Sequence, residues 1–111
     1  MKKLLLSLLL LLSSLTPIQA QEGVVYASWY NIAGITASGK IYNPNGFTAA
    51  YNYLPLKTKV KITNIKNNKS VIVWINDRTC KGNKRIDLTP RAFRQIADLR
   101  QGIIKVKMEV M

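Results

Sequence analysis

A strand–turn–strand pattern in the middle of the chain constrains the fold more than any other feature. The run KTKVKITN alternates Lys59, Lys61 and Thr63 with Val60 and Ile62, which is the period of a half-buried strand. The run KNNK is rich in turn-forming residues, and SVIVWIN follows it as a second strand. Together the runs predict a β-hairpin. Because the second strand is apolar on both faces, we expect it to be central in its sheet.

Two further strands and a long loop complete the predicted sheet. The run VVYASWY (24–30) is β-branched and aromatic, and IIKVKMEV (103–110) alternates apolar with charged residues, so both are expected to be strands. The run NIAGITASGKIYNPNG between the first strand and the hairpin is rich in glycine, asparagine and proline, which predicts a loop.

One helix is indicated after the hairpin. Thr89 can cap its N-terminus, Pro90 suits its first position and Gly102 suits its exit. Its apolar stripe consists of Phe93, Ile96, Ala97 and Leu99. Short strands with one helix in a small chain predict a mainly β fold, a compact β-barrel.

The N-terminus has the three parts of a secretory signal peptide. MKK is the charged region, LLLSLLLLL is the apolar region, and the stretch ends in Ile18-Gln19-Ala20. The apolar region is shorter than the roughly 20 residues that a transmembrane helix needs. We expect cleavage after Ala20, which leaves one domain, residues 21–111, secreted or periplasmic and not inserted in the membrane. An uncleaved anchor is the alternative. No cysteine lies near the cut, so a lipoprotein is not expected.

The composition excludes several classes of active site. There is no histidine and Cys80 is the single cysteine, so a zinc cluster, a Ser–His or Cys–His nucleophile and an internal disulfide are not expected. No glycine-rich phosphate loop follows a strand, and we expect no cofactor. The net charge of +12 predicts an anionic partner such as a cell-wall polymer, a membrane surface or nucleic acid. The alternative is that the lysines only keep the protein in solution.

The remaining chemistry belongs to five carboxylates. Glu22 lies near the expected mature N-terminus, Asp98 on the expected helix and Glu109 on the outer face of the last strand, while Asp87 is expected to support the helix entry. Asp77 alone ends a central strand, in the run VIVWINDRTC. An acid beside a base there belongs either to a structural turn or to the edge of a working site, and the spacing leaves both open.

The order of motifs along the chain resembles the core domain of the rare lipoprotein A family. The shared words are ASWY, TASG, IYNPNGFTAAY, LPL, TKVKITN, INDR and IDLT, and the likeness runs from about Val24 to Val110. The resemblance implies a six-stranded double-psi β-barrel, related to expansin and barwin-like domains. It also implies a periplasmic lytic transglycosylase that cleaves the glycan strands of peptidoglycan, preferably peptide-free ones, and leaves 1,6-anhydro-muramyl ends.

The resemblance further implies roles for single residues. Asp77, in INDR, would be the catalytic acid, because a glycosidic bond breaks when a carboxylic acid protonates the leaving oxygen. The sugar's own 6-hydroxyl then attacks, so one group can act first as acid and then as base. Asn76 and Arg78 would place and frame this acid. Further substrate-binding residues are expected at Trp29, Tyr30, Thr36, Ser38, Lys40 and Tyr51.

Three positions depart from the pattern of the active members of that family. Lys40 stands where they carry Glu, Asn43 where they tend to carry Asp, and Tyr51 where they carry His. If Lys40 faces Asp77, its charge would hold that carboxyl ionised and make protonation of a glycosidic oxygen harder.

Two other function classes remain open. An expansin-like module would bind glycan without cutting it, through the rings of Trp29, Tyr30, Tyr42 and Tyr51 together with lysines, although Trp29 could instead be part of the core. A secreted nucleic-acid binder would rest on charge alone. Lysines at alternating strand positions are typical of any solvated β-face, so the charge alone does not indicate a nucleic-acid ligand. We expect a monomer that binds peptidoglycan glycan strands and no nucleic acid.

Overall fold

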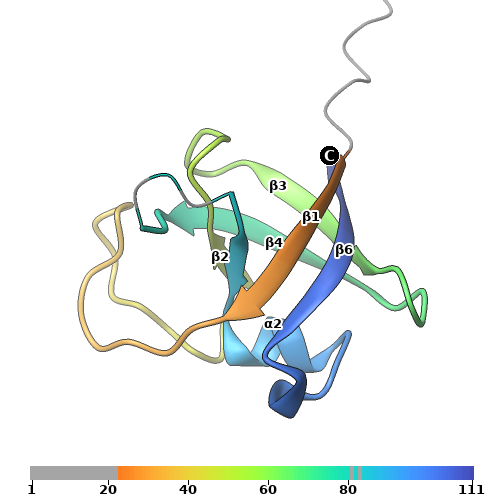
Figure 1. Ribbon diagram of the computed structural model, residues 1–111. Coiled ribbons are helices and arrows are strands. Elements are labelled where there is room, and N and C mark those ends of the chain that lie inside the picture. Colours follow the sequence, from red (N-terminus) through yellow and green to blue (C-terminus); the bar gives the residue numbers. More distant parts are fainter. Residues whose placement is uncertain (1–22, 81, 83) are drawn as a thin grey trace, which may run out of the picture.

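The computed structural model describes residues 23–80, 82 and 84–111, and the predicted signal peptide, residues 1–20, lies outside the described residues. The described chain forms a closed barrel of six strands with one short α-helix (Figure 1). This confirms the predicted mainly β, six-stranded barrel. The strands are β1 (Gly23–Trp29), β2 (Thr48–Ala50), β3 (Lys59–Asn64), β4 (Ser70–Asp77), β5 (Ile86–Leu88) and β6 (Ile103–Val110).

The barrel closes in an order that differs from the order of the strands in the chain. Neighbours run β1-β5-β2-β4-β3-β6, with β1/β5 and β2/β4 parallel and the other pairs antiparallel. Because β2 runs parallel to β4, both strands end at the same edge of the barrel. Tyr51, which follows β2, therefore donates its backbone N–H to the carbonyl of Asp77, the last residue of β4, at 3.0 Å. This edge carries the candidate site.

The predicted hairpin is confirmed as the pair β3/β4, in register from Lys59↔Trp74 to Thr63↔Ser70. β4 has a neighbour on each side, as expected for a central strand. Its inward side chains belong to the core, which includes Val60, Val73 and Ile75, all fully buried. Its outer apolar side chains stay in solvent, since Trp74 is 48% exposed. The strand is therefore buried on one face only, and the apolar residues of its other face lie in solvent.

The helix is shorter than predicted. Thr89 caps α2 (Pro90–Arg94), with its Oγ1 accepting the N–H of Ala92 at 3.2 Å, and Pro90 occupies the first position, as predicted. The helix covers one end of the barrel (Figure 1). After Arg94 the backbone tightens, because Gln95 and Ile96 donate to the carbonyls three residues before them, at 3.1 and 3.0 Å. The carbonyl of Ile96 then accepts the side-chain N–H groups of Asn64 and Asn67, at 2.8 and 2.9 Å. Among the described residues, no helix is both long and apolar enough to span a membrane.

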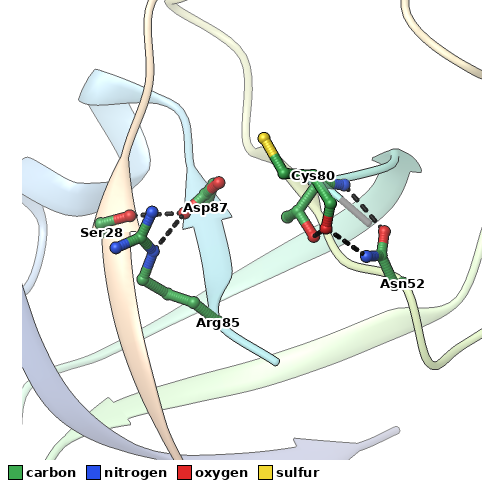
Figure 2. Close-up of polar contacts among 6 residues, drawn as sticks. Ser28, Asn52, Cys80, Arg85 and Asp87 are labelled. Carbon is green, nitrogen blue, oxygen red and sulfur yellow. Dashed lines mark hydrogen bonds and ion pairs between the residues drawn. The ribbon is translucent and has the colours of Figure 1, made fainter. Parts of the chain in front are cut away.

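Two carboxylates have other roles than those predicted. Asp98 does not lie on α2 but caps the separate 3-10 turn η2 (Leu99–Gln101), which ends at Gly102 with φ of 71°. Asp87 does not support the helix entry. It lies on β5 and accepts hydrogen bonds from the hydroxyl of Ser28 and, at 3.2 Å, from Nε of Arg85 (Figure 2). This second difference arises because Asp87 is the middle residue of the strand IDL, which pairs it with β1 and directs its side chain to Ser28.

Candidate functional site

Asp77 is the last residue of β4, and the residue is 9% exposed. Its Oδ1 accepts the backbone N–H groups of Ala37 and Arg78, both at 2.9 Å. Its Oδ2 accepts the hydroxyl of Tyr30 at 3.1 Å. Two donors from the connection after β1 and one from the next residue in the chain therefore hold the carboxyl group in a fixed orientation, with each oxygen in a different hydrogen-bonding environment.

The loop that follows β1 is shaped to present the N–H of Ala37. Thr36 closes it, because its N–H and its hydroxyl both donate to the carbonyl of Lys40 at 2.8 Å. The hydroxyls of Thr36 and Ser38 lie 2.7 Å apart, and the N–H of Ser38 donates to the carbonyl of Asn76 at 3.0 Å. Gly39 has a φ of 89°, a backbone conformation that residues other than glycine disfavour. Thr36 and Ser38 thus build the loop beside Asp77, while their substrate contacts stay a prediction.

Two tyrosine rings pack against each other at a tilt beside the carboxylate. The rings of Tyr30 and Tyr42 have centroids 4.8 Å apart, and the hydroxyl of Tyr42 donates to the carbonyl of Tyr30. Burial, followed by the charge of Asp77, raises the pKa of Tyr42 to about 12. The same two causes, in that order, and the hydrogen bond to Asp77 raise the pKa of the Tyr30 hydroxyl further. Both hydroxyls therefore stay protonated near neutral pH, and Tyr30 serves Asp77 as a hydrogen-bond donor.

The rings expected to stack on sugars are mostly inside the protein. Tyr42 is 5% and Tyr51 8% exposed, so neither offers a free ring face in this structure, and their contact with a sugar stays a prediction. Burial is also the main cause that raises the pKa of Tyr51. Trp29 packs against the core, and its Nε1 donates to the carbonyl of Leu99 at 2.9 Å. These contacts agree with the alternative in which Trp29 is part of the core.

The guanidinium of Arg78 contacts backbone carbonyls, and no ion pair between the described residues joins it to Asp77. Its Nη1 donates to the carbonyls of Tyr51 and Leu54, at 2.7 and 2.6 Å, and so fixes the loop that follows β2. Asn52 joins the loops that follow β2 and β4. Its side chain donates to the carbonyl of Cys80 at 3.0 Å and accepts the N–H of Thr79 at 2.8 Å (Figure 2). Sequence reasoning missed Asn52, because only the parallel pairing of β2 with β4 brings it close.

Lys40 does not lie against Asp77 as the sequence suggested it could. Among the ion pairs and hydrogen bonds of residues 23–80, 82 and 84–111, none joins these two side chains. Lys40 instead lines a pocket of about 340 Å³ on the outer side of β4. Its lining consists of Ser38, Lys40, Lys57, Trp74, Ile75 and Asn76. The Oδ1 atom of Asn76 is buried and has no hydrogen-bond partner among the described residues.

Other hollows lie away from Asp77. One of about 460 Å³ includes Tyr26, Asn67, Gln101 and Lys105, none of which contacts the carboxylate. Within the described part of the chain, no group of three or more His, Cys, Asp or Glu residues could hold a metal ion. The chemistry that the site can perform is therefore that of a single oriented carboxyl group, next to a pocket lined by lysine and tryptophan.

Comparison of sequences places these residues in a known context. The lytic transglycolase family matches residues 22–108. A Rickettsia bellii protein named endolytic peptidoglycan transglycosylase RlpA is 45% identical over 93 residues, which are 78% of this chain and 41% of that protein. Proteins of the same name from Neisseria meningitidis serogroup A and Haemophilus influenzae are each 42% identical, over 75% and 82% of this chain and 36% and 32% of theirs. The chain thus spans less than half the length of these relatives.

Comparison of structures gives the same fold at much lower identity. The Streptomyces papain inhibitor superposes with a TM-score of 0.71 at 19% identity, covering 85% of this chain and 97% of the inhibitor. A mutant expansin of Clavibacter michiganensis in complex with cellohexaose superposes with a TM-score of 0.67 at 18% identity, covering 82% of this chain and 50% of the expansin. These likenesses support the double-psi β-barrel and, at such identities, concern the fold alone.

Proposed function

Because the chain belongs to the lytic transglycolase family, we propose that it cleaves the glycan strands of peptidoglycan as an endolytic lytic transglycosylase. The products would carry 1,6-anhydro-muramyl ends, and the role would be cell-wall remodelling. The observation that carries the proposal is the fixed orientation of the Asp77 carboxyl group at the barrel edge, where β2 and β4 end together.

The two oxygens of Asp77 have different tasks in this proposal. Oδ1 accepts two backbone N–H groups, which leaves it poorly placed to carry a proton. Oδ2 faces only the hydroxyl of Tyr30 among the described donors, and a hydroxyl can turn to accept as well as donate. Oδ2 is therefore the atom that gives the proton to the substrate and later takes one back.

The reaction follows from one acid and the substrate itself. Protonated Oδ2 gives its proton to the glycosidic oxygen as the bond from muramyl C1 to that oxygen breaks, which frees the hydroxyl of the next sugar. The muramyl 6-hydroxyl then attacks C1 and forms the 1,6-anhydro bond, while its proton passes to Oδ2. The carboxyl group ends as it began, and no water is consumed. Tyr30 and Tyr42 are excluded as the base because their pKa values are raised above the ordinary range.

The products formed from peptide-free glycan strands test this proposal. We expect the purified protein to release fragments with 1,6-anhydro ends, identified by mass spectrometry. The Asp77→Asn variant should lose about a hundredfold or more of this rate, the typical scale of general acid–base catalysis, while keeping its circular dichroism spectrum. Unchanged cleavage by Asp77→Asn would move the chemistry to another residue, and loss of folding would assign Asp77 to a structural turn.

A glycan-binding module without cleavage is the second candidate. It is favoured by one observation, the half-exposed indole of Trp74 among lysines on the outer side of β4. Binding of glycan strands by the folded protein without any anhydro product would support it. In both cases the partner is a peptidoglycan glycan strand, and we propose a secreted or periplasmic monomer that does not use nucleic acid as its ligand.

A further inference from the structure

The pocket on the outer side of β4 has the lining of a binding site. Trp74 lies in it with 48% of its surface exposed, which is unusual for the largest apolar side chain. Lys40 enters from the loop after β1, and Lys57 from the loop before β3. The Nζ atom of Lys59 lies 5.5 Å from the centroid of the indole. An apolar plane is thus surrounded by three cations.

Lys57 has an unfavourable backbone conformation at this place. Its φ is 74°, in the left-handed region that glycine adopts freely and lysine does not. The turn is closed by the N–H of Thr58, which donates to the carbonyl of Pro55 at 3.2 Å, and by the N–H of Lys57, which donates to the carbonyl of Ile75 at 2.7 Å. A glycine would serve this turn better than a lysine. The side chain of Lys57 therefore calls for an explanation other than the turn itself.

The charged side chains that line the pocket are all positive. The described residues that line it include two lysines and no acid. The neighbouring lysine on β3 adds to this field, and the whole chain carries a net charge of +12. Such a surface attracts an anion, and the exposed indole favours one that also has a flat apolar face.

The pocket adjoins the Asp77 site through a single loop. In that loop, Ala37 donates to the Asp77 carboxylate at 2.9 Å, while Ser38 and Lys40 line the pocket. On the strand side, Asp77 follows directly after Asn76, which also lines the pocket and whose buried Oδ1 lacks a partner in the described part of the chain. A polymer whose scissile bond lies at Asp77 would place a nearby unit at Trp74.

We propose that this pocket is a subsite for a muramyl residue of peptide-free glycan, with the sugar ring on Trp74 and its lactyl carboxylate at Lys57 and Lys40. The inference rests on the proposed glycan substrate. Removal of the stem peptide frees one carboxylate on each muramyl residue. The pocket would therefore select stripped strands over strands whose lactyl group is still in an amide bond to peptide.

Binding can be measured apart from cleavage in the Asp77→Asn background. The probes are peptide-free peptidoglycan oligosaccharides, and chitin oligosaccharides of equal length, which are neutral. In this background, Trp74→Ala should weaken binding of the peptidoglycan probe by about tenfold, the upper scale of a single aromatic contact. Ile72→Ala is the matched control, since Ile72 is an exposed apolar residue of the same outer face but does not line the pocket.

Lys57→Gly separates the binding role from the folding role. It relieves the left-handed backbone, so the melting temperature should rise, while the affinity for the peptidoglycan probe falls by up to about fivefold. The difference in affinity that Lys57→Gly causes should fade at high salt and be absent with chitin oligosaccharides. Asn68→Gly is the control, because Asn68 also has a positive φ, 62°, but lies in the β3–β4 turn.

The outcomes separate this inference from the proposed function. Equal binding by the Trp74→Ala and Ile72→Ala variants would overturn the subsite, even if the parent protein produces anhydro ends. Loss of binding in Trp74→Ala, in a protein that produces no anhydro ends, would support the subsite and overturn the enzyme. If Trp74→Ala weakened the binding of single-stranded DNA as much as the binding of the glycan probe, the assignment of the subsite to a glycan would be overturned.

Discussion

The β3–β4 hairpin and the loops around Asp77 belong to the same barrel but are stabilised in different ways. In the hairpin, five consecutive residue pairs lie in register and alternate side chains enter the core. Around Asp77, the chain is irregular, and single side chains fix the backbone. The guanidinium of Arg78 joins two carbonyls, Asn52 bridges to residues 79 and 80, and Thr36 closes its own loop.

The difference separates stability from function. Loss of one side chain in the hairpin removes buried apolar surface but leaves the backbone pairing, so it should lower the free energy of unfolding without altering the site. Loss of one side chain around Asp77 removes one of the few contacts that fix these irregular loops. It should misplace the carboxyl group at a smaller cost in global stability.

The largest effect on stability is expected in the hairpin. Ile62 is fully buried and pairs with Val71 on β4 and Met108 on β6. Ile62→Ala should lower the free energy of unfolding by about 2–5 kcal/mol, because it removes apolar contacts and leaves a cavity. Urea unfolding would measure this, and the cleavage rate per folded molecule should not change. Lys61→Ala, on the outer face of the same strand, should stay within about 0.5 kcal/mol.

An intermediate effect is expected for Arg78→Ala. The change removes two charge-assisted hydrogen bonds to the loop after β2, of which one is exposed, so the free energy of unfolding should fall by about 1–2 kcal/mol. Cleavage should fall by about tenfold or more, because this loop and Asp77 lie side by side. Arg78→Lys, which has a single ammonium group, should be intermediate. A drop in stability with an unchanged cleavage rate would place Arg78 with the hairpin residues.

Much of the hairpin could be predicted from the sequence because its signals are local. The alternation of Lys59, Val60, Lys61 and Ile62 fixes which face is buried, and KNNK marks the turn. The surroundings of the segment after the helix could not be predicted, since they involve a remote residue. The side chain of Asn64 donates to the carbonyl of Ile96, 32 positions away, and no periodicity contains that information.

The site was predictable only in part, for a related reason. Asp77 is marked by its place at the end of an apolar strand, and the structure gives its carboxyl group three donors. Two of them, the N–H groups of Ala37 and Arg78, belong to the backbone and have no signature in the residue type. The exposure of Trp74 had no signal in the sequence. Apolar residues on both faces of β4 predicted a central strand, which is confirmed, but they do not show that the indole lies in solvent.

A smaller effect is expected for Tyr30→Phe. The change removes the hydroxyl that donates to Oδ2 of Asp77 at 3.1 Å and keeps the ring against Tyr42. The free energy of unfolding should fall by about 1 kcal/mol, the net value of one hydrogen bond. If Oδ2 transfers the proton, kcat should fall while KM stays near the parent value, which steady-state kinetics on glycan strands would show. A change in KM alone would instead make Tyr30 a substrate-binding residue, as the sequence suggested.

The smallest effect is expected where a side chain fixes the backbone in full contact with water. Asp98 caps η2 and accepts three hydrogen bonds from Arg100, and mainly the side-chain bonds lower its pKa to about 2. An unfolded aspartate titrates near ~3.9, so the carboxylate stabilises the fold above that pH and ceases to do so as the pH falls towards 2. Solvent screens this exposed pair, so Asp98→Asn should lower the melting temperature only slightly at neutral pH. Melting curves of both proteins should converge as the pH is lowered from about 5 towards the folded pKa. A difference that instead stayed constant with pH would show that the cap acts through geometry alone, as the uncharged side chains of Asn52 and Thr36 do around Asp77.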